Sequence, residues 1–326
     1  MTMLLHRTLS PVGVPLALAI GNFDGVHRGH QAIFAAGLEA ARKQALLFAA
    51  MTFQPLPREF FARTRNDASF APARLMSTTE KLAAMVSASI EHAYMPRFDA
   101  KFASQSPDEF VAALKRLNLR WLMVGEDFRF GAKRSGDADT LRRAGVQNGF
   151  TVETMPDVVI GGERISSSAI RDALTIGRLD VAERMLGRPY SIIGRVTHGK
   201  KLGRSLGFPT ANITLTHRKP ALSGVFAVQC RLVTRGLEGV AGIEKIKAGT
   251  ILNGVANLGT NPVVSIDGHH HLEVFLFDFA ADVYGQRLAC TFIEKIRDEQ
   301  NFTGLDALKK QIHDDVSKAT NILRLD

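Results

Sequence analysis

The chain has few cysteines: Cys230 and Cys290 are the only two among 326 residues. They lie far apart in apolar, strand-like runs, and neither belongs to a Cys-x-x-Cys pair. The sequence therefore gives no sign of a disulfide framework or of a cysteine-rich zinc site. We expect a protein of the reducing cytoplasm.

Long hydrophobic runs are also missing. The apolar N-terminal stretch, MTMLLHRTLSPVGVPLALAIG, contains one early arginine and is interrupted by Pro11 and Pro15. Its last part is typical of a buried strand. We therefore predict neither a signal peptide nor a membrane span.

A concentrated positive charge is likewise absent, although the net charge is +9. Residues 1–186 carry 23 basic and 19 acidic side chains, and the remainder carries 18 and 13. Such an even excess without a basic tail favours nucleic-acid binding only weakly and suits small polyanionic ligands equally well. A basic nucleotide- or RNA-binding protein without turnover stays open as an alternative.

The length predicts two domains, each large enough for its own core. The first half contains apolar runs that lead into helical stretches, which is typical of an α/β domain, expected over residues 1–186. Runs at 16–20, 45–53, 121–124 and 150–155 are its expected strands. A Gly-Arg-Pro-Tyr segment beginning at Gly187 is the expected linker.

The turn after the first of these strands reads IGNFDGVHRGHQ and leads into a helical stretch. The free N–H groups at the start of a helix favour an anion, and glycines let the backbone approach it closely. His27 and His30 share one face if the helix begins near them, and two imidazoles there suit a phosphoryl group in transfer. They could also be ordinary turn residues.

Two later segments have a similar character. GEDFRFG, from Gly125, follows a short strand at the expected carboxyl edge of the sheet. ISSSAIR, from Ile165, places serines at a helix start, where they can cap free amides or bind phosphate, with Arg171 as the counter-charge.

The second half changes to short Val-, Ile-, Phe- and Thr-rich runs without intervening helices, near 192–196, 224–233, 250–258, 272–279 and 288–292. This pattern predicts an antiparallel β-barrel over residues 187–326, with a helix from Leu305 onward. Its most informative segment is GRSLGFPTAN. A glycine-rich flap can cover a nucleotide, and the side-chain oxygens of Thr210 and Asn212 suit magnesium, although an ordinary Gly/Pro loop fits the same letters.

The first half resembles the HxGH nucleotidyltransferases, and most closely the FMN adenylyltransferase part of bacterial bifunctional FAD synthetases. The resemblance implies a Rossmann-like domain in which His27, His30 and Arg171 act on ATP. It also implies further ATP contacts at Gly21, Phe23, Asp24, Gly29, Ser166 and Ser167, and flavin contacts at Phe53, Asp127 and Phe128. The family usually has FDPHP at the corner after the second strand, where Gln54 and Leu56 stand here.

GRSLGFPTAN resembles the riboflavin kinase signature almost letter for letter. The resemblance implies that Thr210 and Asn212 hold Mg²⁺, that Glu273 is the catalytic carboxylate and that Arg297 lies on the flavin side. It also implies ATP contacts at Gly203, Arg204, Gly207 and Pro209. Phe275 stands where the family commonly has histidine.

Together these resemblances imply an enzyme that phosphorylates riboflavin with ATP and then joins FMN to AMP, giving FAD and pyrophosphate. The expected partners are the small molecules ATP, riboflavin and FMN, with a homo-oligomer possible and no nucleic acid or membrane. The departures at Gln54 and Leu56 leave open a riboflavin kinase whose first domain has an altered or lost transfer activity.

Overall fold

The computed structural model describes residues 3–198, 207–215, 219–233, 250–259 and 270–325. It divides into two compact units. Met1–Pro72 and Thr78–Ser167 form the first, and Ala73–Ser77 with Ser168–Asp326 form the second. The expected boundary between residues 186 and 187 stays a prediction.

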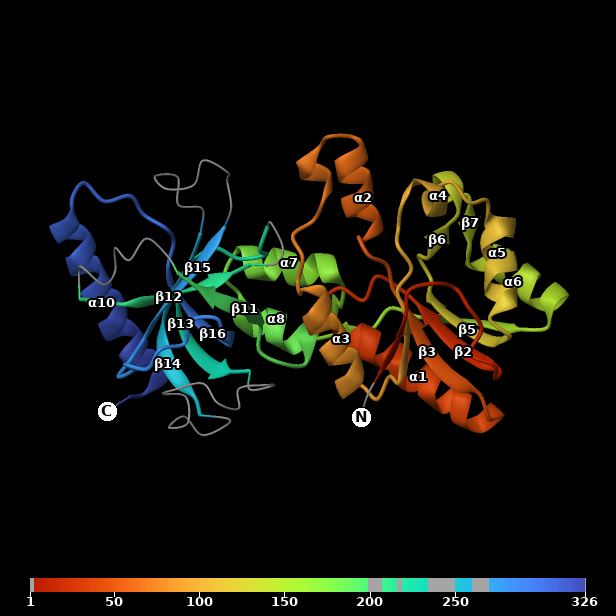
Figure 1. Ribbon diagram of the computed structural model, residues 1–326, viewed down its shortest axis with the longest axis horizontal. Coiled ribbons are helices and arrows are strands. Elements are labelled where there is room, and N and C mark those ends of the chain that lie inside the picture. Colours follow the sequence, from red (N-terminus) through yellow and green to blue (C-terminus); the bar gives the residue numbers. More distant parts are fainter. Residues whose placement is uncertain (1–2, 199–206, 216–218, 234–249, 260–269, 326) are drawn as a thin grey trace. The chain divides into compact units, whose positions relative to one another are not determined.

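The first unit contains a six-stranded parallel sheet with helices on both faces (Figure 1). Its sheet strands are β1 (Leu4–His6), β2 (Leu16–Ile20), β3 (Leu47–Met51), β4 (His92–Tyr94), β5 (Leu119–Gly125) and β8 (Thr151–Met155). Its helices are α1 (Arg28–Gln44), α2 (Pro57–Thr64), α3 (Thr78–Ser87), α4 (Ala100–Ala103), α5 (Pro107–Arg116) and α6 (Ala138–Asn148), with 3-10 turns η1 (Ala68–Phe70) and η2 (Ala132–Arg134). Two small hairpins, β6 (Arg129–Phe130) with β7 (Gly136–Asp137) and β9 (Val159–Ile160) with β10 (Glu163–Arg164), complete it. The predicted α/β class is confirmed.

The strand order is β1-β4-β3-β2-β5-β8. The chain therefore moves from β2 to one side through β3 and β4, and later returns to place β5 on the other side of β2. In open parallel sheets the strand order reverses at such a point, and the crevice beyond the carboxyl ends of the strands there is the usual ligand site. The segments that follow β2 and β5 are the HxGH turn and the GEDFRFG loop, so both lie at this point.

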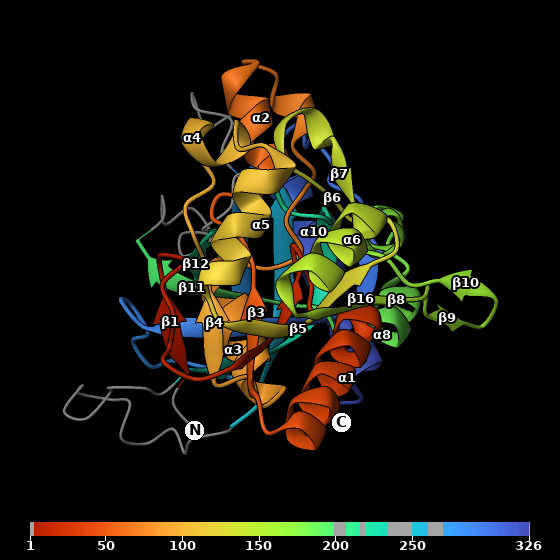
Figure 2. The same ribbon diagram turned by 90° about the vertical axis from the view of Figure 1, so that its right-hand side faces the viewer.

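Residues alternate between the two faces of this sheet. Leu16, Leu18 and Ile20 face a core cluster that includes residues of α5 and α6, whereas α1 packs on the opposite face (Figure 2). Gly37 of α1 lies directly on the ring of Phe48, because a Cβ there would be only 2.1 Å from a ring carbon. Close helix-to-sheet packing fixes the N-terminal end of α1 beside the end of β2.

The second unit is a closed antiparallel barrel, as predicted. Its strands follow the order β11-β12-β15-β14-β13-β16. They are β11 (Ser191–Thr197), β12 (Thr210–Thr214), β13 (Gly224–Leu232), β14 (Leu252–Gly259), β15 (His271–Leu276) and β16 (Arg287–Arg297). The sequence interpretation had treated the segment of β12 only as a ligand-bearing stretch, and the structure shows a strand there.

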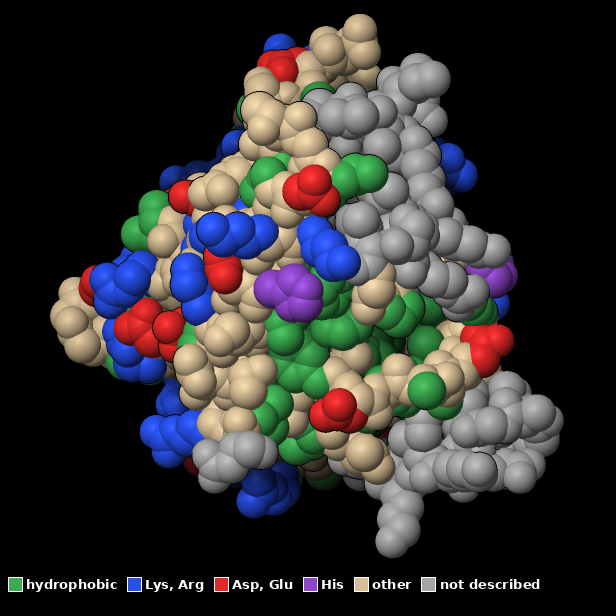
Figure 3. All heavy atoms as spheres, turned by 90° about the vertical axis from the view of Figure 1, so that its left-hand side faces the viewer, with side chains coloured by type: hydrophobic (Ala, Val, Ile, Leu, Met, Phe, Trp, Pro, Cys, Tyr) green, Lys and Arg blue, Asp and Glu red, His purple; other side chains and the backbone are tan. Residues whose placement is uncertain are grey.

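Among the residues that the structure describes, the second unit also has the helices α7 (Ser167–Thr175), which begins at the unit boundary, α8 (Leu179–Leu186) and α10 (Leu305–Leu323). The last of these packs on β13, β14 and β16. This cover explains why Val225 to Val228 of β13 are buried on both faces of the strand. Figure 3 views the unit from the α10 side and shows apolar side chains gathered in the middle of that face.

Candidate active sites

The HxGH turn in the first unit is compact and strained. Phe23 and Val26 have φ angles of 46° and 39°, in the left-handed region that non-glycine residues rarely adopt. Both side chains are buried, at 0% and 2% exposure. Strained backbone held by burial is typical of functional sites, because the surrounding structure must impose it.

The glycines of this turn are required by packing. A Cβ at Gly21 would lie 2.9 Å from the Phe23 ring, and one at Gly29 would lie 3.2 Å from the His27 ring. Asp24 is also buried, and its carbonyl oxygen accepts a hydrogen bond from the Ser167 hydroxyl at 2.8 Å. The structure therefore brings the serine of ISSSAIR to the HxGH turn.

His27 and His30 lie against each other as the spacing predicts. The helix begins at Arg28, and His27 is its N-cap: its Nδ1 accepts from the backbone N–H of His30 at 3.3 Å. The two rings stack with centroids 3.5 Å apart and an interplanar angle of 18°. Within the described residues, Nδ1 of His30 is buried and has no hydrogen-bond partner.

Burial lowers the pKa of His30 well below its usual value, and the neighbouring His27 and Lys81 lower it further. At neutral pH the His30 imidazole is therefore uncharged, with one N–H to donate. The sequence interpretation did not include Lys81, which is almost fully buried in α3.

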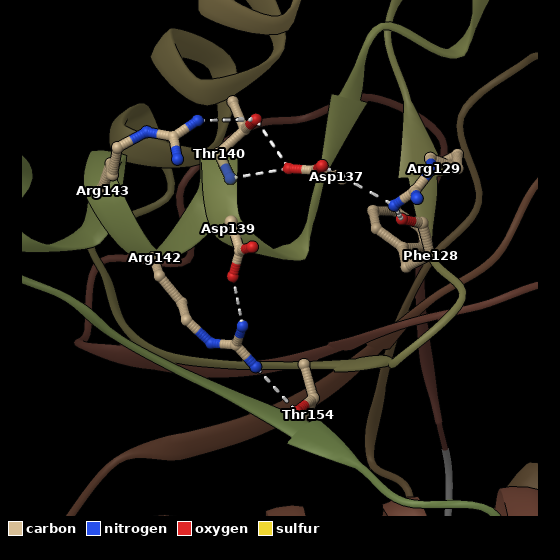
Figure 4. Close-up of polar contacts among 8 residues, drawn as sticks. All are labelled: Phe128, Arg129, Asp137, Asp139, Thr140, Arg142, Arg143 and Thr154. Atoms are coloured by element: carbon tan, nitrogen blue, oxygen red, sulfur yellow. Dashed lines mark hydrogen bonds and ion pairs between the residues drawn. The ribbon is translucent and has the colours of Figure 1, made fainter.

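The GEDFRFG loop begins inside β5 and ends in the β6–β7 hairpin. Asp127 is exposed and pairs with Arg164 at 3.6 Å, and the Phe128 ring stacks on Phe130 at 5.8 Å. Asp137 joins this hairpin to α6 because it accepts hydrogen bonds from the backbone N–H and the hydroxyl of Thr140 (Figure 4). These two bonds lower the pKa of the Asp137 carboxyl.

At the corner after β3, the structure places the remaining first-unit candidates in packed positions. Phe53 is buried against the rings of Phe98 and Phe102. The Gln54 side-chain oxygen accepts from the Thr78 hydroxyl at 3.1 Å, and Leu56 is 5% exposed. These two departures from the family pattern are thus part of the local packing.

Ser166 directly precedes α7, and Arg171 lies within this helix. Ser166 is half-buried in the first unit, whereas Arg171 belongs to the second, where its Nε donates to the carbonyl oxygen of Ala73. Arg171 is partly buried, and this bond fixes the direction of its side chain.

In the barrel, a row of polar residues crosses three strands. Asn212 of β12 lies opposite Glu273 of β15, which in turn lies opposite Asn257 of β14. Directly opposed residues have Cβ atoms about 4.5–5.5 Å apart, so these side chains are neighbours. Ala211, Val274 and Ala256, which alternate with them, are buried inside the barrel, so the row lies on its outer face.

The donor chemistry of this row fits a hard cation. Thr210 is half-buried two residues before Asn212 on the same face of β12, and hydroxyl, amide and carboxylate oxygens are the ligands that magnesium takes. In the described part of the chain, no three His, Cys, Asp or Glu side chains come together as a metal site of their own. Gly207 and Pro209 are exposed just before β12, and Gly203 and Arg204 lie outside the described residues.

Arg297, expected on the flavin side, forms a bidentate ion pair with the buried Asp315 of α10, at 2.9 Å from Nε and 2.8 Å from Nη2. Its Nη1 donates to the carbonyl oxygen of Asp298. The side chain therefore connects the end of β16 to α10.

The fold and the two candidate sites define a class: a two-domain enzyme that combines a nucleotidyltransferase-like α/β unit with a kinase-like barrel. Residues 13–169 match the model of the FAD synthetase family, and residues 186–323 match that of riboflavin kinase. None of the described helices has both the length and the apolar character needed to cross a membrane.

Relatives are similar over almost the whole chain. The bifunctional riboflavin kinase/FMN adenylyltransferase of Pseudomonas fluorescens is 43% identical over 97% of this chain and 95% of its own length. Its counterpart in Escherichia coli K12 is 42% identical over 90% and 88%. The crystal structure of a macrolide-efflux protein from Streptococcus pneumoniae matches 98% of this chain and 99% of its own, with a TM-score of 0.77 and 27% identity.

The chain belongs to the family of bifunctional riboflavin kinases/FMN adenylyltransferases. The resemblance inferred from its motifs is confirmed, and both enzymatic domains are present.

Proposed function

We propose that the two activities use separate residues: the HxGH turn of the first unit for adenylyl transfer, and the Asn212–Glu273 pair of the barrel for riboflavin phosphorylation. The observation that carries the proposal is the stacked His27–His30 pair at the point where the strand order of the sheet reverses.

In the first unit, a phosphate oxygen of FMN attacks the α-phosphorus of ATP, a P–O bond forms to AMP, and pyrophosphate leaves. His27 and His30 donate hydrogen bonds to the phosphate oxygens of ATP as the negative charge on those oxygens grows, and Ser166 and Ser167 hold the remaining phosphates. Gly21, Phe23, Asp24 and Gly29 shape the turn. Phe53, Asp127 and Phe128 supply the flavin side. No protein nucleophile takes part.

In the barrel, the oxygen of the terminal ribityl hydroxyl attacks the γ-phosphorus of ATP. Glu273 accepts the proton of that hydroxyl, and ADP leaves. Thr210 and Asn212 would hold Mg²⁺, which supplies neutralisation of the phosphate charge when it is bound. Gly203, Arg204, Gly207 and Pro209 contribute the nucleotide side, and Arg297 the flavin side. A reducing, cytoplasmic setting is part of the proposal, consistent with Cys230 and Cys290 being buried free thiols.

The experiment compares two variants and one control by measuring each reaction separately. With riboflavin and ATP, Glu273→Gln should lose FMN formation, whereas with FMN and ATP it should still form FAD. His30→Gln should show the reverse. Glu294→Gln replaces an exposed carboxylate on β16 in the same way and should leave both reactions unchanged. Loss of both reactions in either site variant, with the fold intact, would contradict separate sites.

A further inference from the structure

Lys81 is a cation in a position where lysine is rare. Its side chain lies in α3 with 2% exposure, whereas lysine in proteins is almost never fully buried unless its charge has partners. Removing an ammonium from water is energetically costly even after the surroundings relax. A lysine that is buried despite this cost is a candidate for a role at a nearby site.

The ammonium connects the ends of two adjacent strands. Its Nζ donates to the carbonyl oxygen of Asn22 at 2.6 Å and to the hydroxyl oxygen of Thr52 at 3.2 Å. The Thr52 hydroxyl itself donates to the same Asn22 carbonyl at 3.0 Å. Asn22 follows β2 and begins the HxGH turn, and Thr52 follows β3, so these three groups form the base of the turn.

Lys81 also acts on the imidazole above it. It is one of three causes that lower the pKa of His30, after burial and the charge of His27. Two acidic residues lie close in sequence to Asn22 and Lys81: Asp24 in the turn and Glu80 in α3. Both are at least nine-tenths buried. Because the charge of Lys81 is among the causes that lower the pKa of His30, the ammonium lies close enough to the turn to act on charge there.

We propose that Lys81 is a positioning residue for adenylyl transfer: it fixes the Asn22–Thr52 base of the HxGH turn and places a positive charge beside the residues that receive the polyphosphate of ATP. The inference rests on the proposed function of that turn. A charge held in place before the reaction needs no reorganisation during it, and the uncharged imidazole of His30 then contributes a hydrogen bond.

The test uses Lys81→Met and Lys81→Arg, with Lys43→Met as the matched control. Lys43 is an exposed lysine of α1 in the same unit, so the control makes the same change in net charge away from the turn. Two quantities are measured: kcat and KM for ATP in adenylyl transfer from supplied FMN, and the pKa of His30 by NMR titration. Riboflavin phosphorylation by the same samples reports the integrity of the barrel, and circular dichroism reports that the first unit is folded.

Lys81→Met should lower kcat of adenylyl transfer by up to about a hundredfold, the size of effect that misplacement of an active-site group by 1 Å can have. It should also raise the pKa of His30, because one cause of the lowering is gone. Lys81→Arg should keep that pKa near the wild-type value even where its shape reduces kcat. Lys43→Met should change neither quantity.

An unchanged His30 pKa in Lys81→Met, or an equal shift in Lys43→Met, would overturn the inference. If Lys81→Met does not fold, Thr52→Val is used instead, because it removes one partner of the ammonium and keeps the lysine. In Thr52→Val the kcat of adenylyl transfer should fall while the pKa of His30 stays unchanged. An undiminished kcat would overturn the inference. His30→Gln separates the two claims. Its full retention of adenylyl transfer would refute the proposed role of the turn itself.

Discussion

The bidentate pair of Arg297 with Asp315 gives the sharpest stability prediction. Asp315 lies on α10 with a side chain only 3% exposed, and the Arg297 side chain at the end of β16 is 14% exposed. Gln311 also donates to Asp315, at 3.0 Å. Asp315→Ala removes the acceptor of all three donors and leaves a guanidinium without its carboxylate in a nearly dry position.

The magnitude follows from that burial. Removing one partner of a buried ion pair costs about 3–5 kcal/mol, because the remaining charge is uncompensated. Since Arg297 can still reach some water, we expect about 3 kcal/mol, at the lower end of that range. For a domain of this size the melting temperature of the barrel should fall by roughly 6–12 °C.

The assay is denaturant unfolding of the full chain, followed by circular dichroism. Asp298→Ala is the control, because Asp298 forms an ion pair with Lys295 in which the Asp298 side chain is 82% exposed. Exposed pairs contribute little to stability, so this variant should unfold with the wild type. The double change Arg297→Met with Asp315→Leu should be more stable than Asp315→Ala, because it leaves no unpaired charge.

Equal stabilities of Asp315→Ala and Asp298→Ala would refute the reasoning. So would a double variant that is less stable than Asp315→Ala, because the pair would then contribute by its own attraction rather than through the cost of an unpaired charge.

Three further predictions concern the first unit. Gly37→Ala should destabilise it by roughly 1–3 kcal/mol in denaturant unfolding, because the new methyl group meets the Phe48 ring. Ser106→Ala removes the N-cap of α5, whose hydroxyl accepts from the backbone of Glu109, and should cost about 1 kcal/mol by the same assay. The pKa of His30 is lower in the folded than in the unfolded state, so the unfolded state binds a proton first as the pH falls. The free energy of unfolding should therefore be highest above about pH 6.5 and should decrease below it. Unfolding curves measured at a series of pH values should show a weaker pH dependence for His30→Gln.

The sequence predicted the elements whose pattern is long and periodic. The apolar run at 16–20 coincides with β2, and the helix expected from Leu305 onward coincides with α10. The predicted ends of strands were less accurate where the adjoining loops contain apolar residues. The apolar run at 45–53, for example, contains β3 only over Leu47–Met51. The local sequence determines that this segment is a strand, whereas tertiary packing determines where the strand begins and ends.

The short strands were missed because their stability comes from pairing rather than from their own pattern. β1 and β4 have three residues each and exist through parallel pairing with each other and with β3. β12 was missed because the Gly- and Pro-rich segment before it signals a loop. The alternation of Thr210, Ala211, Asn212 and Ile213 was the available signal, since Ala211 and Ile213 are the buried members.

The part of the candidate site that lies within the sequence motifs was predictable from the sequence. The His27–His30 spacing predicted a shared face, and their rings stack. Lys81 was not predictable, because a lysine in an amphipathic helix is usually on its exposed side, and only the fold shows that it points to Asn22 and Thr52. Asp315 was equally hidden, since its partner is 18 residues away on another element.

The most direct test of two separate sites in one chain is chromatography of the products that His30→Gln forms from riboflavin, ATP and Mg²⁺. The account predicts that FMN accumulates at the wild-type rate and that FAD formation is lost. FAD formation at the wild-type rate, or loss of FMN together with FAD in a folded protein, would contradict it.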